Sequence, residues 1–237
     1  MRLEVKNLYK TYGEDSILQD INLNIEGAST IGIIGESGCG KSTLLRLLSG
    51  IEDADRGEID INGLSPMNDK KEFQSKIGVV FQKHNLFPHL TIKKNITLIL
   101  NKIKKLDKEV ASEKADELLK QLYIYPEANK LPHEVSGGQA QRASIARALA
   151  TDPQLIFLDE PTAALDPLLT EEVLKAVKGL KKDGRDFIFV THEIGFLKEF
   201  ADYVIFLKNG NVCECGGREC LETPKTPELA TFLKIVE

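Results

Sequence analysis

Eight residues near the start of the chain have the types and spacing of a phosphate-binding loop. Residues 35–42 read Gly-Glu-Ser-Gly-Cys-Gly-Lys-Ser, which fits a pattern of Gly, four variable residues, Gly-Lys and then Ser or Thr. The glycines let the backbone curl so that consecutive N–H groups point at a phosphate, and the start of a following helix adds partial positive charge. We expect Lys41 to reach the β and γ phosphates of a nucleotide and the Ser42 hydroxyl to ligate Mg²⁺. A glycine-rich turn with a chance lysine is the alternative, and the strand and helix patterns on either side argue against it.

A pair of carboxylates lies much later in the chain, directly after a short apolar run. Residues 155–158 are Leu-Ile-Phe-Leu, a run typical of a buried strand, and Asp159 and Glu160 follow it. The carboxyl ends of strands form the edge at which α/β sheets bind ligands. At that edge Asp159 would hold Mg²⁺, directly or through water, and Glu160 would orient or deprotonate an attacking water. Without a phosphate loop in the same chain, an acidic turn before Pro161 would be the favoured interpretation.

Two further segments are weaker candidates. His192 follows the apolar run 187–190, so it could contact a γ-phosphate at the same sheet edge, although a lone histidine is more often structural or exposed. Residues 136–138 read Ser-Gly-Gly and precede a helix-forming stretch that continues to Ala150. This helix start is either a second anion site or an ordinary capped helix with flexible glycines. The residues alone leave both interpretations open.

The elements that must position these residues are those of an α/β protein. Strands are predicted by the apolar runs at 31–34, 155–158, 187–190 and 203–207. The strand, loop and helix around the phosphate loop indicate a parallel sheet covered by helices. In the N-terminal third, Ile21, Leu23 and Ile25 alternate with asparagines, which predicts a half-buried antiparallel sheet. Asn209-Gly210 predicts a type I′ hairpin turn after the last of these strands.

The amino-acid composition changes between residues 85 and 150, and this change predicts a helical insertion. This stretch is rich in Lys, Glu, Leu and Ala and contains no β-branched runs. Its lysines include Lys93, Lys94, Lys102, Lys104 and Lys105. They could form a basic patch for acidic lipid or nucleic acid, but the solvated side of amphipathic helices is the favoured interpretation.

The composition is that of an ordinary globular protein. The chain has 237 residues, of which 42% are hydrophobic, and its formal net charge is −5. That acidity argues against a surface built to coat nucleic acid, and no run approaches the roughly 18 apolar residues of a membrane-crossing helix. The N-terminus alternates charged and apolar residues instead of forming a signal segment, so we expect folding in the cytosol. We therefore expect Cys39, Cys213, Cys215 and Cys220 to be reduced thiols, and their spacing does not favour a metal site.

Taken together, these motifs resemble those of a known family, the ATP-binding subunits of ABC transporters. The resemblance covers nearly the whole length and rests on motifs that occur in the family's order. They are the phosphate loop at 35–43, Gln82 after the strand 77–81, Val135 to Gln139, the Asp159-Glu160 pair, Ala164-Leu165-Asp166, and His192. The resemblance implies a RecA-like P-loop NTPase core with an N-terminal antiparallel β subdomain and an inserted α-helical subdomain. The core would comprise residues 1–84 and 151–237, and the helical signature subdomain residues 85–150.

The family resemblance also assigns roles to individual residues. It implies that ATP with Mg²⁺ is bound, that Tyr12 stacks on adenine, and that Glu160, His192, Gln82 and Lys41 carry out hydrolysis. The remaining nucleotide contacts would be made by Gly35, Glu36, Ser37, Gly38, Cys39, Gly40, Ser42, Thr43, Ser136, Gly137, Gly138 and Gln139. The metal would be held by Ser42, Gln82 and Asp159. Glu36 departs from the family pattern, because its charge opposes phosphate unless the side chain points to solvent.

The partners follow from the same resemblance. It implies a homodimer or pseudo-dimer with ATP sandwiched at the interface, and a cytoplasmic chain bound peripherally to the inner face of the membrane through transmembrane permease subunits. A substrate-binding protein would be an indirect partner, and no nucleic acid is expected. The chain is most similar to the branch that imports polar amino acids, on residues 80–82, 85–91, 161–167 and 191–196. Alternatives are an ABC ATPase of another importer or exporter class, a non-transport ABC ATPase acting on nucleic acid or ribosomes, and a nucleotide-binding module without turnover.

Overall fold

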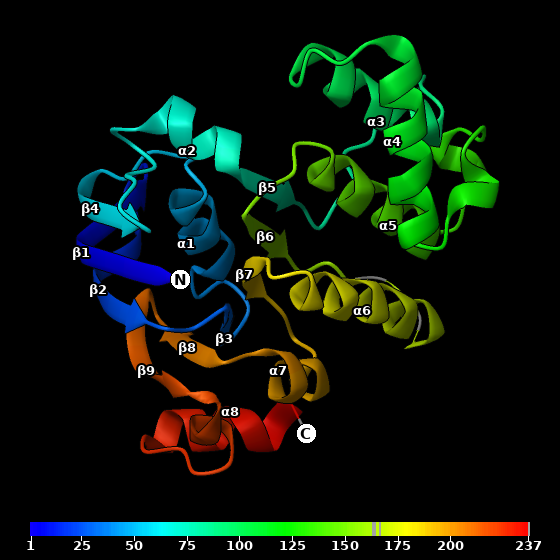
Figure 1. Ribbon diagram of the computed structural model, residues 1–237. Helices are drawn as coiled ribbons and strands as arrows, with labels where there is room; N and C mark the ends of the chain where they lie inside the picture. Colours follow the sequence, from blue (N-terminus) through cyan, green and yellow to red (C-terminus); the bar gives the residue numbers. More distant parts are fainter. Residues whose placement is uncertain (163–164, 166, 237) are drawn as a thin grey trace. The chain divides into compact units, whose positions relative to one another are not determined.

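The computed structural model describes residues 1–162, 165 and 167–236. The chain divides into two compact units, one made of Met1–Gln74 and Asp186–Glu237 and the other of Ser75–Arg185 (Figure 1). Ala163, Ala164 and Asp166, which belong to motifs of the expected family, lie outside the described residues. None of the helices in the described part of the chain combines the length and the apolar character that a bilayer crossing requires.

An antiparallel sheet of three strands forms one part of the first unit. It contains β1 (Arg2–Tyr12), β2 (Asp15–Glu26) and β4 (Arg56–Ile61) in the order β2-β1-β4. Its buried face explains the alternation of the sequence, since Ile21, Leu23 and Ile25 are buried while the asparagines between them are exposed. The predicted half-buried antiparallel sheet is confirmed.

The phosphate-loop pattern follows a strand of a second sheet in the same unit. Its strands β3 (Thr30–Gly35), β7 (Asp186–Val190), β8 (Tyr203–Lys208) and β9 (Asn211–Gly217) lie in the order β7-β3-β8-β9. β3 is parallel to both β7 and β8, and β9 is antiparallel to β8. The β8–β9 turn has φ angles of 49° at Asn209 and 76° at Gly210, as the predicted type I′ turn requires.

The helices of this unit include the one that follows the phosphate loop. They are α1 (Lys41–Leu48), α7 (Ile194–Phe200) and α8 (Pro227–Val236), with a 3₁₀ turn at Arg218–Leu221. The helix α2 (Lys70–Lys76) spans the boundary between the two units. Leu44, Leu45, Leu47 and Leu48 of α1 are fully buried. Gly50, with φ 65°, follows the end of this helix as the sequence indicates.

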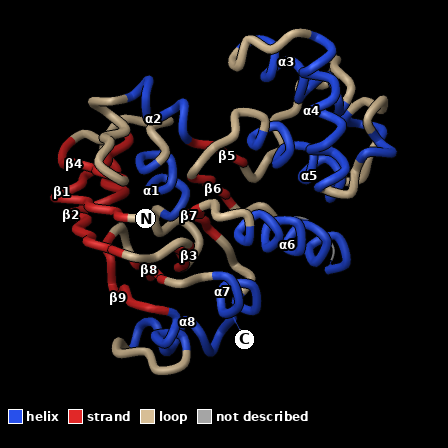
Figure 2. The backbone as a smooth tube through the Cα atoms, in the orientation of Figure 1, coloured by secondary structure: helices blue, strands red, loops and turns tan. Residues whose placement is uncertain are grey.

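The second unit contains two parallel strands and most of the helices. The strands are β5 (Ile77–Val80) and β6 (Leu155–Asp159). The helices are α3 (Ile92–Lys102), α4 (Lys108–Gln121), α5 (Gly137–Leu149) and α6 (Pro167–Lys182), with 3₁₀ turns at Tyr125–Glu127 and Pro132–Glu134. Figure 2 shows α3, α4 and α5 as neighbouring helices with no strand among them.

The helices α3 and α4 pack through residues spaced one turn apart. Ile92, Ile96 and Leu100 are buried on α3, while Ala111, Ala115 and Leu119 are buried on α4. This spacing of four residues places each set on one face of its helix. Residues 85–150 are therefore helical, as expected, although the compact unit that contains them also includes β5, β6 and α6. The division of the chain into subdomains at residues 85 and 150 remains a prediction.

Candidate functional site

The phosphate loop leaves β3 at Gly35 and enters α1 at Lys41. Gly40 forms the N-cap of α1 with φ 102°, a left-handed conformation that costs glycine little. A Cβ atom at Gly40 would lie 2.7 Å from Leu18 Cδ2. The Gly210 N–H donates to the Cys39 carbonyl across 3.2 Å, so the β8–β9 turn supports the loop from outside. These contacts therefore fix the backbone conformation of the loop.

The Lys41 side chain lies inside this loop. It is only 5% exposed, and its ammonium donates to the carbonyls of Gly35 across 3.0 Å and Glu36 across 2.9 Å. An ammonium has three N–H donors, and these two bonds account for two of them. A phosphate in the loop would accept from the third or replace one of the carbonyls. The structure thus places the lysine charge where an anion would be bound.

Cys39 and Glu36 occupy opposite environments in the loop. Burial raises the pKa of the Cys39 thiol, so the side chain is a protonated, unreactive group at neutral pH. Glu36 is exposed, which is the condition under which its charge does not oppose phosphate. A depression of about 360 Å³ lies along this side of the loop. It is lined by Ser16, Ile17, Gln19, Glu36, Ser37, Gly38, Cys39, Asn209 and Gly210.

Tyr12 lies beside the end of the phosphate loop. Its ring is 43% exposed, and its hydroxyl is hydrogen-bonded to a Glu52 carboxylate oxygen and to the Thr43 side chain. Burial of the hydroxyl, together with its hydrogen bond to Glu52, raises the pKa of Tyr12. The Lys10 ammonium lies 5.4 Å from the ring centroid. An exposed aromatic ring next to Thr43 is suitably placed to stack on a base whose phosphates occupy the loop.

His192 lies at the same sheet edge as the phosphate loop. β7 pairs in parallel with β3, with Val190 opposite Ile33; β7 ends at Val190, and β3 ends two residues further on at Gly35. Thr191 is buried and its hydroxyl accepts a hydrogen bond from the Glu193 N–H across 3.0 Å, while His192 is exposed. The structure therefore brings His192 to the edge that the apolar run 187–190 predicted.

Gln82 and Glu160 contact each other in the second unit. Each follows one of the parallel strands β5 and β6, and the Gln82 Nε2 donates to Glu160 Oε2 across 3.2 Å. Asp159 is 5% exposed at the end of β6. Glu160 has φ 46°, a left-handed conformation that is uncommon outside glycine and often found at functional positions. The carboxylate pair and the glutamine thus form one polar group at the ends of these strands.

The Ser-Gly-Gly segment begins α5. The Ser136 hydroxyl accepts from the Gln139 N–H across 3.2 Å, and Gln139 Oε1 accepts from the Ser136 N–H across 2.9 Å. This reciprocal pair is a capping box. Ser136 and Gly137 are exposed, so the N-terminus of α5 is open to solvent. A Cβ atom at Gly138 would lie 3.0 Å from Leu169 Cβ, which shows that α5 and α6 pack closely here.

A buried asparagine was not identified by sequence reasoning. Asn95 of α3 is fully buried, and its Oδ1 accepts from the Phe87 N–H across 2.8 Å. Its Nδ2 lies within hydrogen-bond distance of the carbonyls of Phe87, Leu90 and Thr91. The signal available in the sequence was a polar residue between Ile92 and Ile96, on the apolar face of a helix. Asn95 fixes the loop 87–91.

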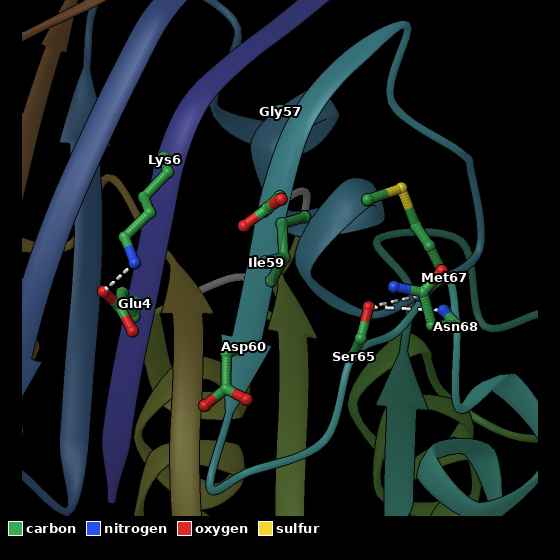
Figure 3. A pocket seen from close by; sticks show the side chains of 9 residues that line it. Glu4, Lys6, Gly57, Ile59, Asp60, Ser65, Met67 and Asn68 are labelled. Carbon is green, nitrogen blue, oxygen red and sulfur yellow. Dashed lines mark hydrogen bonds and ion pairs between the residues drawn. The ribbon is translucent and has the colours of Figure 1, made fainter.

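A larger hollow of about 490 Å³ lies against the antiparallel sheet (Figure 3). It is lined by Glu4, Lys6, Gly57, Glu58, Ile59, Asp60, Ser65, Met67 and Asn68. Glu4 is paired with Lys6 across 2.5 Å and with Arg2, which together hold the pKa of the Glu4 carboxyl below its usual value. Three carboxylates against one lysine repel phosphate. This hollow is therefore not a nucleotide site.

Comparison with known proteins identifies what the chain is similar to. Residues 18–163 match the family model described as ABC transporter. The chain is 43% identical to the general L-amino acid transport ATP-binding protein AapP of Rhizobium johnstonii, over 90% of this chain and 84% of that protein. It is 40% identical to the glutamate/aspartate import ATP-binding protein GltL of Escherichia coli, over 98% of both. Among solved structures, the dimeric post-hydrolysis state of an ATP-binding cassette bound to ADP and Pi is 36% identical, with a TM-score of 0.81 over 91% of this chain and 98% of that chain.

Proposed function

Since this chain belongs to the ABC transporter family, we propose that it powers the uptake of polar amino acids into the cell. As a member of that family it is an ATP-binding subunit and an ATPase. One observation supports the assignment of polar amino acids as substrates: the chain matches proteins of amino acid import over nearly its full length. That match includes the helical residues 85–150, through which the family resemblance implies contact with a membrane subunit.

We propose that the first unit binds the nucleotide. The N–H groups of residues 35–43 and the Lys41 ammonium bind the phosphates, since Lys41 is already held inside the loop. Tyr12 stacks on the adenine, and its exposed ring beside Thr43 supports that role. His192 contacts the γ-phosphate from the neighbouring strand β7. Glu36 remains in solvent and contacts the nucleotide through its backbone only.

The donor set fits Mg²⁺. The ligands implied by the family resemblance would be the Ser42 hydroxyl, the Gln82 amide oxygen and the Asp159 carboxylate, all hard oxygen donors of the kind that Mg²⁺ prefers. In the described part of the chain, no group of three or more His, Cys, Asp or Glu side chains could hold a metal ion by itself. The phosphates of a bound nucleotide would supply the remaining oxygens. Mg²⁺ bound with the nucleotide would neutralise charge on the phosphates.

Glu160 and Gln82 act on the attacking water. Glu160 orients the water and accepts its proton, because it is a carboxylate at a strand end and is held by Gln82. The Gln82 Nε2–H donates to Glu160 Oε2 and thereby orients the carboxylate. This assignment is supported by the 3.2 Å contact between the two side chains.

A second copy of the chain completes each site. Ser136 to Gln139 would contact the γ-phosphate that the partner copy binds, so two nucleotides lie between two copies. The Ser136 hydroxyl accepts a hydrogen bond within its capping box, which leaves its own O–H available to donate to a phosphate. The exposed N-terminus of α5 adds partial positive charge at the same place. Dimeric cassettes of this fold support the arrangement.

The membrane partner docks on the loop after Gln82. Phe87 in this loop is 40% exposed, and Asn95 holds the backbone around it in a defined shape. An exposed aromatic side chain on a fixed loop is a suitable anchor for a permease subunit. The chain would then be peripheral on the inner face of the membrane, with a substrate-binding protein acting on the other side.

An uptake assay tests the proposal. Deleting the gene from its source organism should abolish uptake of at least one labelled polar amino acid, with glutamate, glutamine and arginine as the first candidates. The wild-type gene should restore uptake, whereas a Glu160→Gln gene should not. Undiminished uptake of all polar amino acids in the deletion strain would contradict the proposed substrate class.

A further inference from the structure

The segment that carries Gln82 is attached to helix α5 by the Gln141 side chain. Gln141 is buried one turn into the helix, and its Nε2 donates to the Phe81 carbonyl across 3.4 Å. Its Oε1 accepts from His84 Nδ1 across 2.5 Å. These two contacts lie on either side of Gln82 in the sequence. The backbone around Gln82 is thus held from both ends by one side chain.

Arg147 attaches the same segment further along the helix. Its Nη1 donates to the Asn85 carbonyl across 2.6 Å, and its Nη2 donates to the His84 carbonyl across 3.3 Å. Asn85 has φ 49°, so the guanidinium holds a bent backbone. The Arg147 Cζ also lies 6.0 Å from the Phe87 ring centroid. Burial lowers the pKa of Arg147.

These contacts connect two parts of the proposed machinery. Gln82 contacts Glu160 at one end, and α5 begins at the Ser136 cap at the other. Arg147 lies eleven positions after Ser136, and a helix is stiff over the corresponding length of about 16 Å. We infer that Gln141 and Arg147 are positioning residues, which hold residues 81–85 on α5 so that the contact of Gln82 with Glu160 follows the position of the Ser136 end of the helix.

The inference rests on the proposed roles of Gln82 and Glu160, and it gives those roles a physical connection. When a partner displaces Phe87 or Ser136, the contacts of Arg147 and Gln141 transmit the movement, because breaking them would leave a half-buried guanidinium and a buried amide without these partners. The Gln82 amide then approaches or leaves Glu160. Hydrolysis would thereby depend on the position of α5 without any α5 side chain beyond its cap touching the nucleotide.

A double-mutant cycle tests the positioning role. Arg147→Lys keeps the charge but lacks the fork that reaches two carbonyls. Because Arg147 is not among the residues proposed to bind the nucleotide, we expect kcat for ATP hydrolysis to fall about fivefold or more while KM for ATP stays within about twofold. In a Gln82→Ala background, where Arg147 has no amide to position, the same substitution should lower the single-turnover rate by less than about twofold.

Arg185→Lys is the matched control. The Arg185 guanidinium also donates to a backbone carbonyl, that of Pro153 across 2.7 Å, and to the Asp152 carboxylate, and both partners lie outside residues 81–85. We expect this variant to keep wild-type kcat. Circular dichroism at the assay temperature verifies that each variant is folded. If Arg147→Lys is not folded, the double-mutant cycle is repeated with Gln141→Met in its place. This substitution conserves size and removes the contacts with Phe81 and His84.

The outcomes separate this inference from the proposed function. Equal loss of rate in the wild-type and Gln82→Ala backgrounds would overturn the positioning role and leave the ATPase assignment intact. A loss that appears in KM instead of kcat would also overturn it. A folded wild-type dimer that fails to hydrolyse ATP would overturn both.

Discussion

Replacing Asn95 by leucine provides a quantitative test of how the loop 87–91 is held. The substitution nearly conserves size and removes all four polar contacts of the side chain. The carbonyls of Phe87 and Thr91 keep partners, because they also accept from the N–H groups of Leu90 and Asn95 itself. The Phe87 N–H loses its acceptor, which costs about 1–3 kcal/mol, and the Leu90 carbonyl loses one bond worth about 1 kcal/mol.

Burial of the leucine offsets part of this loss, by about 1 kcal/mol. The expected net destabilisation of the helical unit is therefore about 1–3 kcal/mol, or about 2–12 °C in Tm at 2–4 °C per kcal/mol. Thermal unfolding followed by circular dichroism measures it. The matched control is Asn24→Leu on the exposed face of β2, which should change stability by less than about 0.5 kcal/mol. Equal Tm values for the two variants would refute the reasoning.

Two further predictions concern the phosphate loop and the C-terminal thiol. Lys41→Met should weaken ATP binding about 10- to 100-fold by removing a charged donor to phosphate, and an unchanged Kd in calorimetric titration would count against the phosphate-loop assignment. Burial raises the pKa of the Cys220 thiol from 9.0 to about 11, so the folded state holds this proton more tightly than the unfolded state. The resulting stability is present below pH 9 and is lost as the pH rises toward 11. Cys220→Ala should therefore lose less Tm between pH 8.5 and 11 than the wild type, and parallel curves would contradict this cause.

Local patterns predicted the parts of the fold that short segments determine. The phosphate loop could be predicted because Gly40 and Lys41 act through the backbone and helix start directly beside them. The turn at Asn209-Gly210 was equally local, since both residues tolerate positive φ angles. The strand ends at Asp159 and His192 followed from apolar runs long enough to be buried strands.

The contacts that hold the second unit together were not predictable in the same way. Gln82 and Glu160 are 78 residues apart, and only the pairing of β5 with β6 brings them together. Asn95 and Gln141 look like ordinary polar positions on helices, because a sequence does not show which helix face a distant loop will cover. Arg147 resembled any basic residue near a helix C-terminus, yet its guanidinium binds two carbonyls of the loop instead of facing solvent.

The most direct test of the central claim is the effect of Glu160→Gln on ATP binding and phosphate release. The substitution conserves size and hydrogen bonding but removes the carboxylate that orients water and accepts its proton. We expect ATP affinity within about twofold of the wild type and phosphate release slowed about 100-fold or more, with ATP-bound dimers accumulating in size-exclusion chromatography. Hydrolysis at the wild-type rate by this variant would contradict the assignment of Glu160 and the mechanism built on it.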